Sequence, residues 1–293
     1  MSDEPQRERR AVLGTAGLLA AATAVPGLAS PARAGAAGPP AAGTGIAESQ
    51  TGGPGAAARD ALTLDTMRGL AVFVMPGPDA YSRAQGTPAR EPGGIEARLP
   101  EFLVDALDRY LPAPDLPAVP LVRALRDGVP GLLREPVPDA ALRAGLGVDA
   151  LLESDATIPL SPLVALLLNA EALRVDPRTV AGPFLAPFSR LAFGRKADVF
   201  ELLEGADPDL VELLDARLPE PLKRTASGLL RFLGGALLEL AALGGYSEWA
   251  VFDPASRRLR DRPVGWRISG YTPAAEGRPE FRGYYQGRTE VTG

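Results

Sequence analysis

The sequence predicts a mostly α-helical protein: a single helical domain that ends in an irregular, aromatic-rich tail, which can include a short β-hairpin. Three observations support this fold class. Apolar residues recur at spacings of three and four after residue 59, prolines and glycines divide this pattern into short segments, and the helical period stops near residue 253. A chain of 293 residues is long enough to bury a sizeable core.

The first 34 residues have the layout of a twin-arginine export signal. Arg9 and Arg10 stand directly before a weakly apolar run that contains Leu13 and extends to Leu28. This arrangement predicts that the twin-arginine export machinery recognises Arg9, Arg10 and Leu13 and carries the folded protein to the cell envelope or the medium. The alternatives are an arginine-rich disordered tail and a retained membrane anchor, since the run has about the minimum length for a bilayer span.

Small residues mark the expected end of this signal. Ala32 and Ala34 flank an arginine in a small-x-small triplet, so we expect cleavage after Ala34. The next segment, residues 35–58, is almost wholly Ala, Gly, Pro, Thr and Ser. Such a segment buries too little apolar surface to offset its chain entropy, so we predict a flexible linker. The helical domain is expected to occupy residues 59–293, with the tail starting at about residue 253.

The chain contains no cysteine and no histidine. This composition excludes disulfides, thiolate nucleophiles, thiolate or imidazole metal ligands, and serine–histidine catalysis. Carboxylates, tyrosines, arginines and two lysines, Lys196 and Lys223, remain for chemistry. The net charge is -5, and no basic block rises above the interspersed charges, so nucleic-acid binding is not expected.

The first predicted helix has Thr63 as its N-cap and ends before Pro76. Its apolar face repeats at helical spacing and comprises Leu64, Met67, Leu70, Ala71 and Val74. A turn-rich segment over residues 76–94 follows, and a second amphipathic helix is predicted over residues 95–110.

Prolines divide the middle of the chain into short helical turns, with candidate helices at residues 119–126 and 139–145. Ser161 and Pro162 then place a capping side chain and a first-turn proline at the start of a helix. The body of this helix, residues 163–175, is apolar nearly all round. We therefore predict that it lies at the centre of the core.

Two further helices are predicted at residues 197–204 and, opened by Asp207, up to residue 218. Residues 222–243 then form the most apolar stretch after the signal. This stretch carries the charged residues Arg224, Arg231 and Glu239, which argue against a membrane span. We predict a core helix here and no membrane span in the mature chain.

The pattern changes after Tyr246. Residues 248–252 are predicted to form a short strand or the last turn of a helix, and residues 253–256 a turn. Glycines and aromatic residues without a helical period fill residues 265–288. This composition predicts an extended tail that wraps around the helical body.

Two clusters are candidates for contact with a partner. Asp79, Tyr81 and Gln85 lie in the turn-rich segment, where loops often carry binding residues; the alternative is an ordered turn in which Asp79 accepts hydrogen bonds from nearby amides. The second cluster is the aromatic tail, which can form a protein interface, a carbohydrate-stacking platform or simple packing onto the helices. Its candidate contact residues are Trp266, Tyr271 and Tyr284.

No catalytic, cofactor-binding or metal-binding residue is predicted. Acid pairs such as Glu91 with Glu96, or Glu276 with Glu280, have nothing that places them across a cleft, as glycoside hydrolysis requires. No glycine-rich loop follows a strand, so no bound nucleotide is expected. We therefore expect a non-enzymatic protein, and an enzyme built on carboxylates alone is the remaining alternative.

Short motifs near the two ends carry a resemblance to a known family. The motifs LTLDTMRGL (residues 62–70), VMPGPD (74–79) and GWRISGY (265–271) resemble elements of the small (gamma) subunit family of membrane-associated gluconate dehydrogenases. With DAYS (79–82), EPGG (91–94) and GYY (283–285), the full pattern is more similar to a group of twin-arginine-exported actinobacterial proteins of unknown function. The resemblance covers the middle of the chain poorly.

This resemblance implies a non-catalytic helical subunit that supplies the export signal and escorts a signal-less flavoprotein of the glucose–methanol–choline type. In that family the flavoprotein holds the FAD and performs the oxidation, so no active-site residue is implied in this chain. The leading hypothesis is an exported accessory subunit of a secreted flavin-dependent oxidoreductase. The alternative is a free-standing extracellular or envelope binding protein that holds a glycan or a lipid with its aromatic tail.

Overall fold

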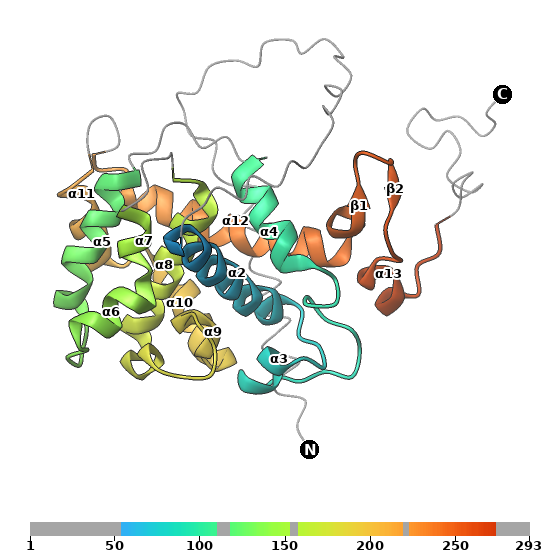
Figure 1. Cartoon of the computed structure of the whole chain (residues 1–293), viewed down its shortest axis with the longest axis horizontal. Coiled ribbons are helices and arrows are strands. Elements are labelled where there is room, and N and C mark those ends of the chain that lie inside the picture. The colour runs from blue at the N-terminus through green and yellow to red at the C-terminus, as the bar shows by residue number, and fades with distance from the viewer. Residues whose placement is uncertain (1–53, 110–117, 153–157, 219–222, 274–293) are drawn as a thin grey trace, which may run out of the picture.

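The computed structural model describes residues 54–109, 118–152, 158–218 and 223–273 and confirms a mostly α-helical fold (Figure 1). The β-structure of this described part is a two-stranded antiparallel sheet near its C-terminal end. Several predicted features lie outside the described residues: the export signal with Arg9, Arg10 and Leu13, the cleavage residues Ala32 and Ala34, and the tail residue Tyr284.

Most elements are short helices that follow one another closely along the chain. In order they are α2 (Pro54–Val74), α3 (Ala80–Ala84), α4 (Leu99–Arg109), α5 (Ala118–Leu132), α6 (Asp139–Leu146), α7 (Val148–Leu152), α8 (Leu160–Val175), η1 (Pro177–Val180), α9 (Pro187–Arg190), α10 (Phe193–Gly205), α11 (Pro208–Asp215), α12 (Ala226–Tyr246), η2 (Trp249–Val251), β1 (Phe252–Asp253), β2 (Arg258–Leu259) and α13 (Val264–Ser269).

Helix α2 begins inside the segment predicted as a flexible linker over residues 35–58. The helix starts at Pro54, so the folded domain includes residues 54–58 as well. Three consecutive alanines at 56–58 explain the difference, because alanine has the strongest intrinsic preference for helix. The predicted N-cap is therefore wrong: Thr63 lies within the helix, and its Oγ1 donates a hydrogen bond to the carbonyl of Arg59 at 2.9 Å.

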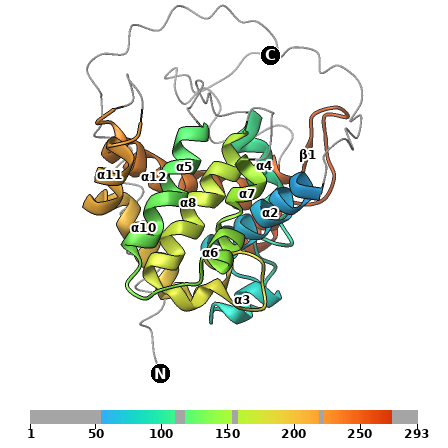
Figure 2. The same ribbon diagram turned by 60° about the vertical axis from the view of Figure 1, so that its left-hand side comes forward.

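Helix α8 lies at the centre of the core, as its sequence predicts. Every residue from Ser161 to Arg174 is buried, and α2, α5, α9 and α10 all contact this helix. Figure 2 shows α8 between α10 and α2. Its start differs in detail, because the helix begins at Leu160. The amide and hydroxyl of Ser161 donate hydrogen bonds to the carboxylate of Asp108, at 2.8 and 2.9 Å. The cap thus comes from α4, far away in the sequence, and the local pattern could not indicate it.

The other predicted helices of the central region are present with shifted ends. Helices α5 and α10 are longer than the predicted segments 119–126 and 197–204, and the turn-rich segment contains the short helix α3. The N-cap predicted at Asp207 is confirmed, because its Oδ1 accepts a hydrogen bond from the amide of Leu210 at 3.0 Å.

Helix α12 is only partly a core helix, which corrects the prediction for residues 222–243. Its inner face packs on α2, α4, α10 and α11, while its outer face is exposed and carries Phe232, Leu243 and Tyr246. Apolar content did not reveal this division, because alanine, glycine and leucine occur on both faces. Within the described residues, α12 is also the one helix long and apolar enough to cross a membrane. The expected lack of a span therefore stays a prediction.

The chain after α12 forms a short hairpin. Strands β1 and β2 pair antiparallel with Phe252 opposite Leu259. The turn predicted at residues 253–256 joins them, and the carboxylate of Asp253 accepts a hydrogen bond from the amide of Ala255 at 3.1 Å.

Helix α13 follows the hairpin and contradicts the extended structure predicted from residue 265 onward. Pro263 precedes this helix, and Gly270 ends it with a φ of +69°. Proline and glycine at these two places are typical helix boundaries. A helix of six residues is too short to show a hydrophobic period, which is why the pattern missed it.

Candidate interaction site

The turn-rich segment with Asp79 is an ordered part of the helical body. Asp79 is the N-cap of α3, and its carboxylate accepts hydrogen bonds from the amide and the hydroxyl of Ser82, at 2.9 and 2.6 Å. The hydroxyl of Ser82 in turn accepts a hydrogen bond from the amide of Gly77 at 2.9 Å. These bonds form the ordered turn that the sequence offered as the alternative. Contact of Asp79 with a partner stays a prediction.

Tyr81 connects this segment to α2. Its hydroxyl donates a hydrogen bond to Asp65 Oδ1 at 2.5 Å, and its ring stacks on Phe184 with ring centroids 4.1 Å apart. Burial, and then the Asp65 carboxylate, raise the pKa of Tyr81 to about 12. The other oxygen of Asp65 accepts a hydrogen bond from the amide of Ala186 at 2.9 Å. One buried carboxylate therefore holds three segments together.

Gln85 is 2% exposed, and both ends of its amide are used inside the molecule. Its Nε2 donates a hydrogen bond to the carbonyl of Val72 at 2.7 Å, and its Oε1 accepts one from Lys196 Nζ at 2.8 Å. Gln85 therefore fixes the end of α3 against α2 and α10 and leaves little surface for a partner.

Lys196 is completely buried, and burial lowers its pKa to about 7, although the carboxylates of Asp79 and Asp65 act in the opposite direction. A buried amine with a low pKa is a typical catalytic group. Here, however, the Nζ is enclosed between two protein oxygens and the ring of Phe188, whose centroid is 5.4 Å away. We assign Lys196 a structural role. The sequence identified it only as one of two lysines, and no local signal marked its burial.

A second buried charged cluster joins α8 to α11. Arg174 donates from Nη1 to both carboxylate oxygens of Glu171, at 2.9 and 3.1 Å, and from Nη2 to Asp207 at 2.9 Å. Burial raises the pKa of Glu171 to about 7, against the opposing effect of Arg174. These three groups stabilise one another inside the helical body, and the sequence analysis did not single them out.

No metal-binding arrangement occurs among the described residues, where no group of three or more potential ligands comes together. Of the acids weighed for catalysis, Glu96 accepts a hydrogen bond from the amide of Gly93 at 2.8 Å and so stabilises a turn. Glu276 and Glu280 lie outside the described part of the chain.

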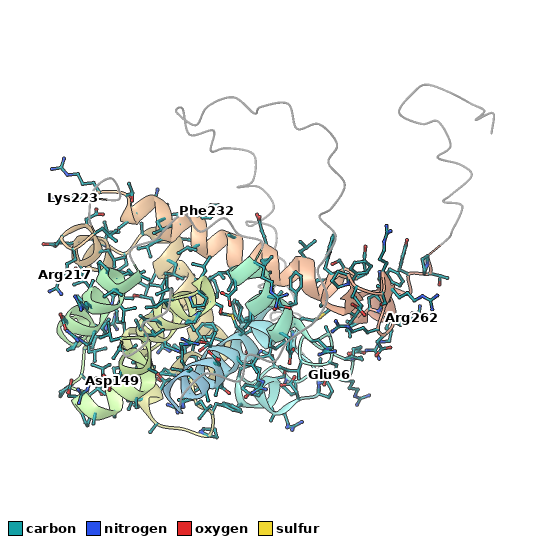
Figure 3. All side chains as sticks on the ribbon, turned by 45° about the horizontal axis from the view of Figure 1, so that its top comes forward. Glu96, Asp149, Arg217, Lys223, Phe232 and Arg262 are labelled. Carbon is teal, nitrogen blue, oxygen red and sulfur yellow. The ribbon has the colours of Figure 1, made fainter. Side chains whose placement is uncertain are left out.

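Three large apolar side chains are exposed on the outer side of α12, and the exposed Glu239 lies among them on the same side. Phe232, Leu243 and Tyr246 are 63%, 51% and 50% exposed, and their spacing places all three on one side of the helix. We call these three side chains the helix face; Figure 3 labels Phe232 on it. Large exposed apolar patches commonly mark sites of association. The sequence missed this surface because it cannot show which side of an apolar helix is covered.

Residues 247–273 form a small lobe beside the C-terminal end of α12 (Figure 1), which we call the C-terminal lobe. The structure brings two of the predicted contact residues together here: the rings of Trp266 and Tyr271 meet edge to face with centroids 5.2 Å apart. Gly265 packs directly on the backbone of Tyr246. The lobe is therefore adjacent to the helix face, although contact of either residue with a partner stays a prediction.

A groove of about 690 Å³ lies between the start of α2, helices α6 and α7, and the segment before α9. Small side chains such as Ala58, Ala144 and Gly145 leave this space open, and Arg59 and Arg143 also line it. The groove is thus a mainly apolar hollow with cationic groups among its lining residues.

Comparison with protein-family models, with curated proteins and with solved structures finds no match for this chain. The fold and its surfaces define a helical protein with exposed apolar side chains on the outer side of α12. A functional assignment therefore depends on the chain's own residues.

Proposed function

We propose that this protein is an exported, non-catalytic accessory subunit that binds a secreted flavin-dependent oxidoreductase through the helix face of α12. The exposure of Phe232, Leu243 and Tyr246 carries this proposal. Fully burying one such side chain contributes about 1.5–3 kcal/mol, so a partner that covers all three gains a substantial part of the free energy of binding.

The buried ionisable groups support a non-catalytic role. Lys196 and Glu171 have pKa values near 7, which catalysis could use, yet both are enclosed and hydrogen bonded within the helical body. The export signal and the motifs shared with the gluconate dehydrogenase small subunits are the grounds for a flavoprotein as the partner. That class of partner follows from the resemblance alone.

Affinity purification of the tagged protein from its source organism tests this proposal. We expect a flavoprotein to co-purify, detected by flavin absorbance, and its yield to fall at least tenfold for Phe232→Ser combined with Leu243→Ser. Val119→Ser is the control, because Val119 is a 38% exposed apolar residue on α5, away from both α12 and the groove. Recovery of no flavoprotein, or equal recovery with the helix-face variant, contradicts the proposal.

The groove favours a second candidate function, a free-standing binding protein of the cell envelope. The small apolar side chains that line the groove would accept an apolar ligand. Ala144→Leu should fill part of the groove and abolish the rise in melting temperature that such a ligand causes. A screen of fatty acids and short glycans by thermal shift tests this candidate, with Ala140→Leu, an exposed position elsewhere on α6, as the control.

A further inference from the structure

We propose that the C-terminal lobe docks the protein on the surface of an anionic lipid bilayer. The lobe gathers positive charge in a chain whose net charge is -5. Only three carboxylates, Glu248, Asp253 and Asp261, accompany its arginines. Within residues 247–273 the arginines number five, and all of them are exposed: Arg257, Arg258, Arg260, Arg262 and Arg267.

Most of this positive charge is available to an external anion. Arg260 pairs with Asp253 inside the lobe, but the nitrogen and oxygen are 3.8 Å apart, which is long for an ion pair. Arg262 donates a hydrogen bond to the carbonyl of Tyr271, an uncharged acceptor, at 3.0 Å. Because these contacts neutralise little of the charge, an anionic surface remains the complementary partner.

The same lobe exposes the side chains that favour a membrane–water interface. Trp249, Tyr271 and Ile268 are 53%, 49% and 44% exposed. Tryptophan and tyrosine concentrate at the level of lipid headgroups, because one end of each side chain is apolar and the other is polar. Arginines beside such groups add attraction to anionic headgroups, so aromatic insertion and charge act together.

The position of the lobe suits this role. It lies at one end of the helical body, next to the end of α12, whereas α5 and α6 lie at the other end (Figure 1). Val264 anchors it to the body by packing with Met75 and Ala97. If the lobe docks on a bilayer, the helical body would project away from the membrane, with α5 and α6 at the far end. This inference goes beyond the proposed accessory role and does not depend on the partner at the helix face.

Vesicle binding tests the proposal with a chain that begins at Gly35, the product expected from signal cleavage. The two tryptophans of the chain, Trp249 and Trp266, both belong to the lobe, so intrinsic fluorescence reports on this region alone. We expect co-sedimentation with vesicles of phosphatidylglycerol and phosphatidylcholine, accompanied by a blue shift of the tryptophan emission. Pure phosphatidylcholine vesicles should bind at least tenfold less protein, and high salt should release it.

Paired substitutions identify the surface responsible. Arg258→Gln with Arg267→Gln should lower the partition coefficient about 30-fold, since each arginine near an anionic surface contributes about fivefold. Arg123→Gln with Arg134→Gln removes the same charge from exposed sites on and just after α5 and should leave binding unchanged. Circular dichroism checks that both variants remain folded.

Three outcomes would overturn the proposal. They are equal binding to neutral and anionic vesicles, an equal loss of binding in the two paired variants, and no vesicle binding at all. The last outcome would favour an acidic protein surface as the partner of the lobe. If no flavoprotein co-purifies but the protein still binds anionic vesicles, the accessory role is refuted and the docking proposal remains supported.

Discussion

The ammonium nitrogen of Lys196 lies 2.8 Å from Gln85 Oε1 and 2.9 Å from the carbonyl oxygen of Gly69. These two acceptors belong to the end of α3 and to α2, while Lys196 itself is on α10. A neutral amine keeps two N–H groups, which matches the two acceptors. The lysine can therefore lose its proton without leaving either oxygen unpaired, which agrees with its lowered pKa.

Lys196→Met should destabilise the protein by about 2–4 kcal/mol. The substitution keeps a similar volume but leaves the buried Gln85 Oε1 without its donor, which costs about 1–3 kcal/mol, and removes the hydrogen bond to the Gly69 carbonyl, worth about 0.5–1.5 kcal/mol. Chemical denaturation measures the difference. Lys223→Met, at an exposed position, is the control and should leave stability unchanged; equal effects of the two substitutions would refute the bridging role.

Stability should rise with pH between about 7 and 10. The pKa of Lys196 is about 7 in the folded state and close to 10.5 when the chain unfolds. The unfolded state therefore binds more protons in this range, and the free energy of unfolding increases with pH, by at most about 1.4 kcal/mol per unit. Denaturation at several pH values should show this slope in the unaltered protein and a flat profile in Lys196→Met. A slope that persists in the variant assigns the effect to another group.

Arg174→Met should cost about 3–5 kcal/mol at pH 8, because it leaves the buried carboxylate of Glu171 without its counter-charge. Arg174 lowers the pKa of Glu171, which burial raises to about 7, so in the variant this carboxyl group takes up its proton at a higher pH than in the unaltered protein. The loss should therefore be largest at high pH, shrink as the pH falls toward 7, and stay constant below that. Arg178→Met is the matched control, because it breaks the ion pair of an exposed arginine with Asp176. Its free energy of unfolding should equal that of the unaltered protein.

Two glycines of α12 should respond oppositely to alanine. A methyl group at Gly244 would overlap the ring of Phe102 and lie 2.8 Å from Leu99 Cδ1, so Gly244→Ala should cost about 1–3 kcal/mol. Gly235 faces open space, so Gly235→Ala should stabilise the helix by about 0.5–1 kcal/mol. Thermal unfolding compares them, and a loss of stability in both would contradict the packing described for α12.

Periodicity predicted the helices well wherever a segment was long or apolar all round, as for α8. It failed at boundaries and in short elements. Helix α2 started earlier than expected, α13 was missed, and the cap of α8 came from Asp108 on another helix. The causes differ: local alanines extend α2, α13 is too short to show a period, and the cap of α8 comes from a residue outside the window that carries the pattern.

The candidate sites show the same limit. Asp79, Tyr81 and Gln85 were recognisable as a special cluster, yet their partners, Asp65 and Lys196, are distant in the sequence. The helix face was not recognisable, because a sequence does not show which side of an apolar helix is covered. Of the C-terminal lobe, the sequence indicated the aromatic residues Trp266 and Tyr271 but not the exposed arginines beside them in the chain.

Composition and local spacing were enough to establish the helical class and the absence of thiol and imidazole chemistry, and to predict export. Which polar groups are buried together, which side of α12 is open, and which arginines and aromatic residues of the C-terminal lobe are exposed became known only from the packing. Burial and proximity arise when distant segments pack, and no local pattern encodes them.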